Sequence, residues 1–253
     1  MKYNKLLNSI SFVFPCYNEE ENIPSLISEV VSIAPKVAKK YEIILVNDGS
    51  TDGTAKVIKE FASQNKNIRL VSQKNQGFGG ALNTGFQAAK YDWVFYSDAD
   101  LQFDLSEITK FIPYTDENDL VIGYRQNRAE GFKRIVYATG MKVLNTLYLG
   151  FPYHIKDIDC AFKLINRSVI KSVGPLVSKG NLVSTEFLLQ AYNLGFSIHQ
   201  IGVRHYVRLF GESKCGSIKD VFVVIKELNK LKSKIVKKHR LYRLGEAYLS
   251  KAL

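Results

Sequence analysis

The chain has 253 residues, of which 46% are hydrophobic and 23% are charged, and this composition excludes a disordered protein. The three cysteines, Cys16, Cys160 and Cys215, are widely spaced and form no CxxC pair, so neither a disulfide framework nor a zinc site is indicated. No run approaches the roughly 18 apolar residues of a membrane-spanning helix, and the first residues lack the apolar stretch of a secretion signal. We therefore expect a protein of the reducing cytoplasm.

The net charge is +11, and most of it lies toward the end of the chain. Residues 214–253 contain 11 Lys or Arg and 3 Asp or Glu, which gives +8. Within this stretch, residues 218–238 carry apolar side chains at helical spacing with lysines on the other face, which predicts a basic amphipathic helix. Nucleic acid, anionic lipid and plain solvation would each explain such a segment.

The first hundred residues alternate short apolar runs with longer amphipathic ones. This pattern is typical of a mostly parallel, Rossmann-like sheet with helices on both faces, and so of an α/β fold. The expected strands are residues 11–14, 42–46, 68–71 and 93–96, and the expected helices are residues 23–38, 54–62 and 81–89.

The second half of the chain is less regular. Its apolar runs and helical periodicity predict further elements before the basic helix. The expected strands are residues 120–122, 162–165 and 197–203, and the expected helices are residues 105–112, 134–148 and 185–194.

A polar segment follows each of the first four expected strands. These segments are residues 15–19, 47–50, 75–77 and 97–100. Ligands of open α/β sheets bind at the carboxyl ends of the strands, so the four polar tips are expected to converge on one binding edge.

Asp98 and Asp100 follow the fourth strand and are two residues apart, so in extended geometry their side chains point to the same side and Gln102 continues the row. Oxygen ligands without His or Cys suit a hard cation such as Mg²⁺ or Mn²⁺. Such a cation neutralises the charge that builds on a departing diphosphate in sugar transfer. The alternative is a solvated turn whose aspartates cap the next helix.

Asp48 lies in a glycine-rich turn, where its carboxylate is a candidate acceptor for the N–H edge of a pyrimidine or guanine base. Tyr17 and Pro15 are candidates to pack on that base, although a loop tyrosine is more often simply half-buried. Helix capping alone would explain the nearby Asp52 and Thr54.

The glycines of residues 77–85 match neither a dinucleotide fingerprint nor a P-loop. Leu82 stands where the fingerprint requires Gly, and Phe86 stands where the P-loop requires Lys. What remains is a glycine-rich helix start, which can place amides near an anion, and Gln76 and Gly79 are its candidate donor-binding residues.

Asp157 and Asp159 precede the strand at residues 162–165, and arginines and other donors lie around them in the sequence. Phosphates and diphosphates are bound by such cations, although any one arginine can equally be a surface residue. The candidates are Arg125, Arg128, Arg134, His205, Arg208, Ser213 and Lys214.

Together these motifs resemble the family 2 glycosyltransferases with the GT-A fold, and specifically the dolichol-phosphate mannose synthase branch. The resemblance covers about residues 9–216, which we take as the catalytic domain, with residues 217–253 as a basic helical tail. It is carried by residues 15–19 (PCYNE), 46–54 (VNDGSTDGT), 75–81 (NQGFGGA), 98–102 (DADLQ) and 205–214 (HYVRLFGESK).

The resemblance implies an inverting direct displacement and assigns roles by position. Pro15, Tyr17, Glu19 and Asp48 would bind the nucleoside, and Asp98, Asp100 and Gln102 would hold the metal. Arg125, Arg208 and Lys214 would fall around the donor diphosphate and the acceptor phosphate. Asp157 matches the family's acceptor-side aspartate, and we expect it to orient the acceptor or to act as the base.

The acceptor is less well defined than the donor. Ala161 and Lys163 replace the usual glycine and arginine of the branch, and Lys offers a point charge instead of a bidentate fork. A polyprenyl phosphate, dolichyl or undecaprenyl, is already ionised and needs no strong base, whereas a saccharide hydroxyl of a cell-envelope polymer needs one.

A polyprenyl-phosphate acceptor predicts peripheral docking of the tail on the cytoplasmic face of a membrane. A nucleic-acid-binding protein is the remaining alternative, but no RNA or DNA module supports it. The sugar, the choice between UDP and GDP, and the oligomeric state stay open.

Overall fold

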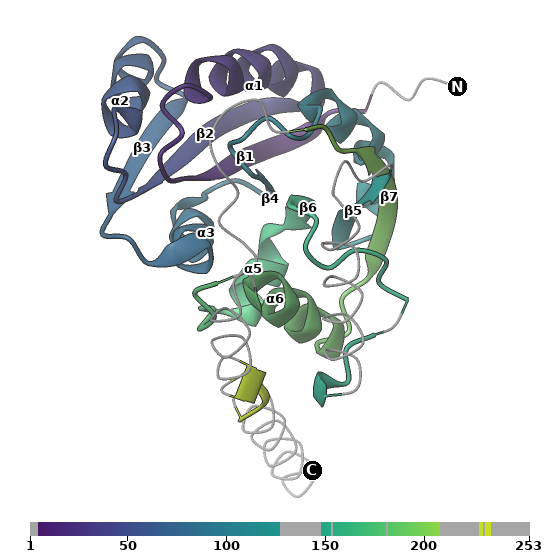
Figure 1. The fold of residues 1–253 in the computed structure, drawn as a ribbon. Helices are drawn as coiled ribbons and strands as arrows, with labels where there is room; N and C mark the ends of the chain where they lie inside the picture. Colours follow the sequence, from purple (N-terminus) through teal and green to yellow (C-terminus); the bar gives the residue numbers. More distant parts are fainter. Residues whose placement is uncertain are drawn as a thin grey trace, which may run out of the picture.

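A seven-stranded sheet forms the centre of the computed structural model, which describes residues 5–126, 148–152, 154–180, 182–207, 228–229 and 231–233 (Figure 1). The strand order is β3-β2-β1-β4-β6-β5-β7. The strands are β1 (Leu7–Cys16), β2 (Ala38–Asp48), β3 (Ile68–Gln73), β4 (Trp93–Ser97), β5 (Leu120–Gln126), β6 (Phe162–Asn166) and β7 (Ile198–Arg204).

Helices cover both faces of the sheet. On one face lie α1 (Ile23–Val37) and α2 (Thr54–Gln64), and on the other lie α3 (Gly77–Ala88), α5 (Arg167–Val173) and α6 (Leu182–Asn193) (Figure 1). The predicted α/β fold with a mostly parallel sheet is therefore confirmed.

The strands β1 to β4 run parallel to one another. β1 pairs with β2 on one side and with β4 on the other, and β2 pairs with β3. β6 is antiparallel to both β4 and β5, which leaves β5 parallel to β4. The carboxyl ends of β1 to β4 thus meet at one edge, and the chain order reverses between β1 and β4, where such sheets bind ligands.

Burial explains why these segments form strands and helices. All of β1 is buried except Asn8, as expected of a central strand covered on both faces. Phe95 in β4 packs edge-on against Phe12 of β1 at 5.7 Å and against Phe162 of β6 at 4.7 Å between ring centroids. One apolar stripe of α1 is buried against the sheet.

The predicted elements within the described residues are confirmed to within four residues at each end, with one exception. In place of a helix over residues 105–112 there are two short 3-10 turns, η1 (Leu105–Lys110) and η2 (Ile112–Asp116). Pro113 has no N–H, and its ring clashes with the carbonyl four residues earlier in a regular helix, which disfavours one continuous helix through residues 105–112 and beyond.

Two elements differ from what the hydrophobic periodicity of the sequence predicts. β2 begins at Ala38, four residues before the expected start at residue 42. Its first residues pair with β1 but include exposed lysines, which break the apolar pattern on which the prediction rests. The seven-residue helix α5 has no counterpart in the prediction and is capped by Asn166, whose side chain accepts the N–H of Ser168. The predicted helices at 134–148 and 218–238 lie almost wholly outside the described residues.

Within the part of the chain that the structure describes, no helix is long and apolar enough to cross a membrane. Cys16 and Cys160 are free thiols in the interior, and burial raises the pKa of Cys160 to about 12.

Glu42 is a buried carboxylate near the amino-terminal ends of the strands. Its Oε1 atom accepts from the Ser11 hydroxyl at 2.7 Å and from the Lys90 N–H at 3.0 Å, and its Oε2 atom accepts from Arg69 at 2.7 Å. Burial by itself raises the pKa of Glu42, but these donors outweigh it and hold the pKa below its ordinary value.

Glu42→Gln is expected to lower the free energy of unfolding by about 2 kcal/mol at pH 7, because hydrogen bonds to a charged acceptor are lost. The carboxylate's contribution is fully present above the unfolded-state pKa and disappears as the pH falls through the lowered folded-state pKa. Urea unfolding of both proteins should therefore give a difference that shrinks at about pH 3. An unchanged difference at that pH would contradict this role of the charge.

Candidate active site

The polar tips of the first three strands form one rim. The N–H of Thr51 donates to Asn18 Oδ1 at 2.8 Å, and the N–H of Asn18 donates to Ser50 Oγ at 3.1 Å, which joins the loops after β1 and β2. Gly49 has a φ of +72°, and a Cβ there would lie 2.8 Å from Asn75 N in the loop after β3. This close approach requires glycine, and the three loops are held against one another.

Asp48 is buried at the end of β2, with 3% of its surface exposed. Its Oδ1 atom accepts from Gln73 Nε2 at 2.7 Å and from the N–H of Gln76 at 2.8 Å. Among the described residues nothing donates to its Oδ2 atom, which leaves one carboxylate oxygen for a ligand. Gln76 therefore acts on Asp48 through its backbone, while its own side chain is exposed.

The other nucleoside candidates lie in or just after β1. Tyr17 is half-buried in the rim, whereas Pro15 is buried within the strand, opposite Val46, and offers little surface on which a base could pack. Glu19 accepts from Asn22 Nδ2 at 2.6 Å, and its N–H donates to Thr54 at 2.9 Å.

The prediction for Gly79 needs correction. Its N–H, expected to face an anion, donates instead to the carbonyl of Lys179 at 2.8 Å. A Cβ at Gly79 would also collide with the carbonyl of Ser178. The glycine is thus required by the packing of the 178–179 backbone on α3, and its amide is occupied by protein.

Asp98 and Asp100 lie in a bend after β4 and not in an extended row. Leu101 adopts a φ of +59°, which is rare for a residue with a side chain and turns the chain away from the strand direction. The two carboxylates are nevertheless close. Burial, together with the charge of Asp100, raises the pKa of Asp98 to about 7, against the opposing charges of Lys163 and Arg125.

Gln102 is held by a segment distant in sequence. Its side-chain Nε2 donates to the Tyr206 carbonyl at 2.9 Å, and its own carbonyl accepts the Tyr206 N–H at 2.8 Å. Its N–H donates to Asp100 Oδ1 at 3.2 Å. The amide oxygen of Gln102 accepts from none of the described residues, so Gln102 can supply an oxygen beside the acidic pair.

This donor set fits a hard divalent cation. Each of the two carboxylates makes ionisation of the other less favourable, and a cation bound between them offsets that repulsion. The amide oxygen of Gln102 adds a ligand of the kind that such a cation binds. Within the described residues no group of three or more His, Cys, Asp or Glu side chains could hold a metal.

The structure brings Arg125 and Asp157 together as a bidentate pair. Arg125 Nε donates to Asp157 Oδ2 at 2.8 Å and Arg125 Nη2 donates to Oδ1 at 2.9 Å, while the Arg125 N–H also reaches Oδ2 at 3.2 Å. Both side chains are largely buried. The pair fixes the plane of the guanidinium, and it lies near enough to Asp98 for the charge of Arg125 to act on that carboxylate.

Lys163 is an additional buried cation at this site. Its Nζ donates to the Ile158 carbonyl at 3.1 Å and to the Cys160 carbonyl, and lies 5.3 Å from the ring centroid of Tyr96. Burial acts to lower the pKa of Lys163, but neighbouring groups, Tyr96 first, raise it above its ordinary value. Lys163 thus fixes the turn that carries Asp157, a role that sequence patterns give no means of finding.

Residues 11–174 match the family described as glycosyl transferase family 2. This chain is a family 2 glycosyltransferase. The match spans β1 to α5 and contains both the Asp48 rim and the acidic pair, so the family predicted from the motifs is confirmed.

Four curated relatives of this glycosyltransferase bear the name undecaprenyl-phosphate 4-deoxy-4-formamido-L-arabinose transferase. The protein from Proteus mirabilis (strain HI4320) is 30% identical over 217 residues, and the one from Pectobacterium atrosepticum is 31% identical over 216 residues. In both, the match covers 84% of this chain and 64% of the relative, so the chain spans less than two thirds of their length.

Solved structures support the GT-A fold. Glucosyl-3-phosphoglycerate synthase from Mycobacterium tuberculosis, with Mn²⁺, UDP-glucose and phosphoglyceric acid, matches with a TM-score of 0.64 and 20% identity over 88% of this chain and 78% of its own. Its UDP complex matches with a TM-score of 0.63 and 22% identity over 89% and 80% of the two chains.

Arg208 and Lys214, the other predicted phosphate-binding cations, lie outside the described residues. Arg128, Arg134 and Ser213 lie outside them as well.

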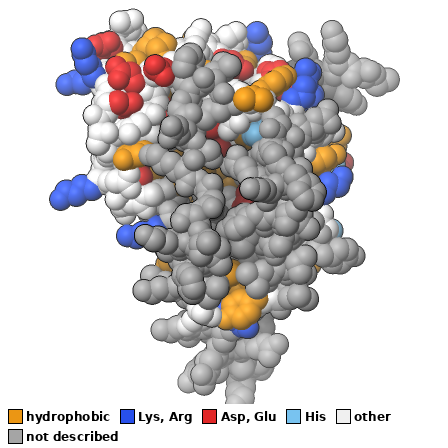
Figure 2. Space-filling view, in the orientation of Figure 1, with side chains coloured by type: hydrophobic (Ala, Val, Ile, Leu, Met, Phe, Trp, Pro, Cys, Tyr) orange, Lys and Arg blue, Asp and Glu red, His pale blue; other side chains and the backbone are white. Residues whose placement is uncertain are grey.

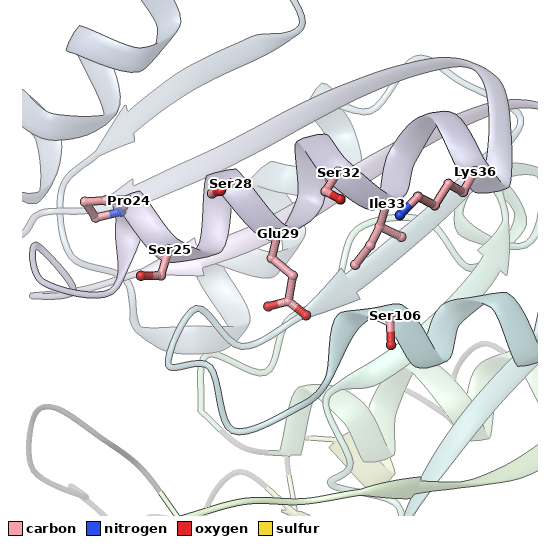
Figure 3. Close-up of a pocket in the computed structure, with 8 residues that line it drawn as sticks. All are labelled: Pro24, Ser25, Ser28, Glu29, Ser32, Ile33, Lys36 and Ser106. Atoms are coloured by element: carbon pink, nitrogen blue, oxygen red, sulfur yellow. The ribbon is translucent and has the colours of Figure 1, made fainter.

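An open hollow of about 640 Å³ runs along α1 and the start of η1 (Figure 3). Its lining includes Ser25, Ser28, Ser32 and Glu29, but none of the strand-tip residues. Glu29 points toward η1 and accepts the Leu105 N–H at 2.8 Å, and burial raises its pKa. The carboxylate ties η1 to α1, and the hollow is separate from the acidic pair.

Proposed function

We propose that this glycosyltransferase moves a sugar from a UDP- or GDP-sugar to a polyprenyl phosphate, with Mg²⁺ or Mn²⁺ as its cation. The observation that carries the proposal is the acidic pair Asp98 and Asp100, set between the Asp48 rim and the Arg125–Asp157 ion pair. Family membership supports glycosyl transfer, and the names of the relatives support an undecaprenyl phosphate as acceptor.

The rim supplies the donor's nucleoside site. Asp48 Oδ2 would accept an N–H of the base, while Oδ1 stays fixed by Gln73 and Gln76. Tyr17 and Glu19 would border the same nucleoside. A carboxylate whose partners are already in place loses little freedom when the ligand binds, which favours affinity.

The oxygens of Asp98, Asp100 and Gln102 would hold the cation. When bound, the cation offsets the negative charge of the leaving diphosphate. Arg125, held flat by Asp157, would donate to the phosphate oxygens from the other side, and Arg208 and Lys214 would add further cations.

In the proposed reaction an acceptor phosphate oxygen attacks the anomeric carbon of the sugar. The new carbon–oxygen bond forms as the bond to the diphosphate breaks, so the configuration inverts and the nucleoside diphosphate leaves. The attacking oxygen is already ionised, and no proton has to be removed. The role of the described residues is then to position charge rather than to transfer protons.

A saccharide hydroxyl acceptor would need a general base. Two carboxylates near the acceptor side are engaged: Asp157 accepts from Arg125 with both oxygens, and Glu186 accepts backbone N–H groups of Val177 and Ser178. This commitment favours the phosphate acceptor over the hydroxyl.

Contact with the cytoplasmic face of a membrane, through residues 217–253, is part of the proposal. Nucleic acid is not proposed as a partner. In Figure 2 the described Lys and Arg side chains lie scattered near the edges of the view.

The test is incubation with a panel of UDP- and GDP-sugars, Mg²⁺ or Mn²⁺, and a polyprenyl phosphate, with mass identification of the product. A lipid-linked phosphodiester that forms only with the cation is expected. A parallel panel of saccharide acceptors serves as the control. A glycoside from those acceptors, with no lipid product, would overturn the assignment of the acceptor while leaving that of the donor intact.

A further inference from the structure

Glu186 is a fully buried carboxylate in the second turn of α6. Its Oε2 atom accepts the N–H of Ser178 at 2.8 Å and that of Val177 at 3.0 Å, and its Oε1 atom accepts Gln190 Nε2 at 3.2 Å. A buried carboxylate is tolerated only with such donors. Two of the three are backbone amides of the loop that precedes α6, so the charge fixes that loop.

The same loop is docked on the other side against the first half of α3. The N–H of Leu176 donates to Asn83 Oδ1 at 3.2 Å, and the Lys179 carbonyl accepts the Gly79 N–H at 2.8 Å. A Cβ at Gly77 would lie 2.7 Å from that carbonyl, so the approach depends on glycine. Residues 176–179 thus lie between α6 and α3 with hydrogen bonds to both.

The start of α3 in turn fixes the carboxylate of the rim. Gln76, the residue before α3, donates its N–H to Asp48 Oδ1 at 2.8 Å, and Gly77 and Gly79 follow directly. Three hydrogen bonds, joined by short stretches of backbone, therefore connect Glu186 through residues 178–179 and the first turn of α3 to Asp48. Its ends are a buried charge and the proposed acceptor for the nucleoside base.

We propose that Glu186 is a positioning residue of the donor site, acting through the 176–179 loop on the start of α3 and on Asp48. The inference rests on the proposed function, since it takes Asp48 as a nucleoside-binding residue. In other glycosyl transfers a carboxylate near the acceptor acts as a base, but here Glu186 works on donor affinity and not on the chemical step.

The test compares Glu186→Gln and Asn83→Ala with the unchanged protein, by calorimetric titration with UDP and GDP in the presence of Mn²⁺ and by steady-state kinetics. Gln keeps the shape of Glu186 but loses the charge, and it offers one acceptor oxygen where the carboxylate offers two. Affinity for the nucleotide is expected to fall about tenfold, with a matching rise in KM for the donor and a kcat within about twofold. Asn83→Ala leaves the buried charge in place and is expected to weaken the nucleotide by about threefold, since one neutral hydrogen bond is lost.

Asp119→Asn is the matched control. Asp119 also accepts a backbone N–H and a hydroxyl, both from Ser197, but lies at the amino-terminal end of β5, away from the strand tips. It should lower Tm without changing nucleotide affinity.

Each possible result bears on either the inference about Glu186 or the proposed function. Equal nucleotide affinity in the unchanged protein and in folded Glu186→Gln overturns the inference, as does an equal loss in Asp119→Asn. If Glu186→Gln does not fold, Asn83→Ala decides, and unchanged affinity there overturns it. No nucleotide binding by the unchanged protein would instead overturn the proposed function, which separates the two failures.

Discussion

Asp100→Asn is expected to reduce glycosyl transfer on the order of 10²- to 10³-fold, because the cation site loses one of its two charges. Asn keeps an oxygen that can accept the Gln102 N–H, so the bend after β4 is retained and the change tests charge rather than shape. Manganese binding, followed by electron paramagnetic resonance in the absence of substrates, should weaken in parallel. A variant that transfers normally would contradict the assignment of the cation to this pair.

Asp104→Asn provides the control for that prediction. Asp104 lies in the same segment, is only partly buried, and accepts the N–H of Ser106 at 3.0 Å as the cap of η1. The variant has the same replacement of a carboxylate by an amide, four residues away from Asp100. Normal manganese binding and transfer are expected, since an Asn in this position caps a helix as well as Asp does.

The arrangement of the strand tips could be predicted because it follows from topology. Apolar runs that alternate with helical periodicity imply parallel strands, and parallel strands bring their carboxyl ends to one edge. Asp48 and the pair Asp98 and Asp100 were placed together on that argument, and the pairing of β1 with β2 and β4 bears it out.

Local backbone geometry at the same edge could not be predicted in this way. The row of Asp98, Asp100 and Gln102 assumed an extended chain, but Leu101 with its positive φ bends the chain, and such conformations depend on surrounding contacts. The prediction that the Gly79 amide faces an anion was wrong for a related reason. A glycine-rich helix start serves an anion or a crossing backbone equally well, and only the position of Lys179 decides.

Polar contacts between residues that are distant in the sequence also could not be predicted. Lys163 lies in an otherwise apolar strand, and Glu186 in an apolar helix, where sequence reasoning treats a charge as exposed or catalytic. Both are buried, and both fix loops whose backbone atoms carry no sequence signal. Buried charges of this kind mark the places where the fold imposes a geometry on the site.

Asp157→Asn and Arg125→Met are each expected to reduce transfer on the order of 10²-fold, and the double variant should lose no more than the worse single variant. The reason is the bidentate pair: without Asp157 the guanidinium loses its orientation, and without Arg125 the carboxylate loses the guanidinium that it orients. Steady-state kinetics of the unchanged protein, the two single variants and the double variant gives the coupling free energy between the two residues. Losses that multiply in the double variant would show instead that Asp157 acts independently, as a base toward a hydroxyl acceptor.

Stability has to be separated from function in that cycle, because removing one partner of a largely buried ion pair leaves a charge without compensation and costs about 3 kcal/mol. Arg69→Met is the matched control, since Arg69 pairs with the buried Glu42 near the amino-terminal ends of the strands. It should lower Tm and leave kcat unchanged. A loss of transfer in Arg69→Met equal to that in Arg125→Met would assign the effect to folding, whereas a normal rate there assigns it to the oriented guanidinium beside the acidic pair.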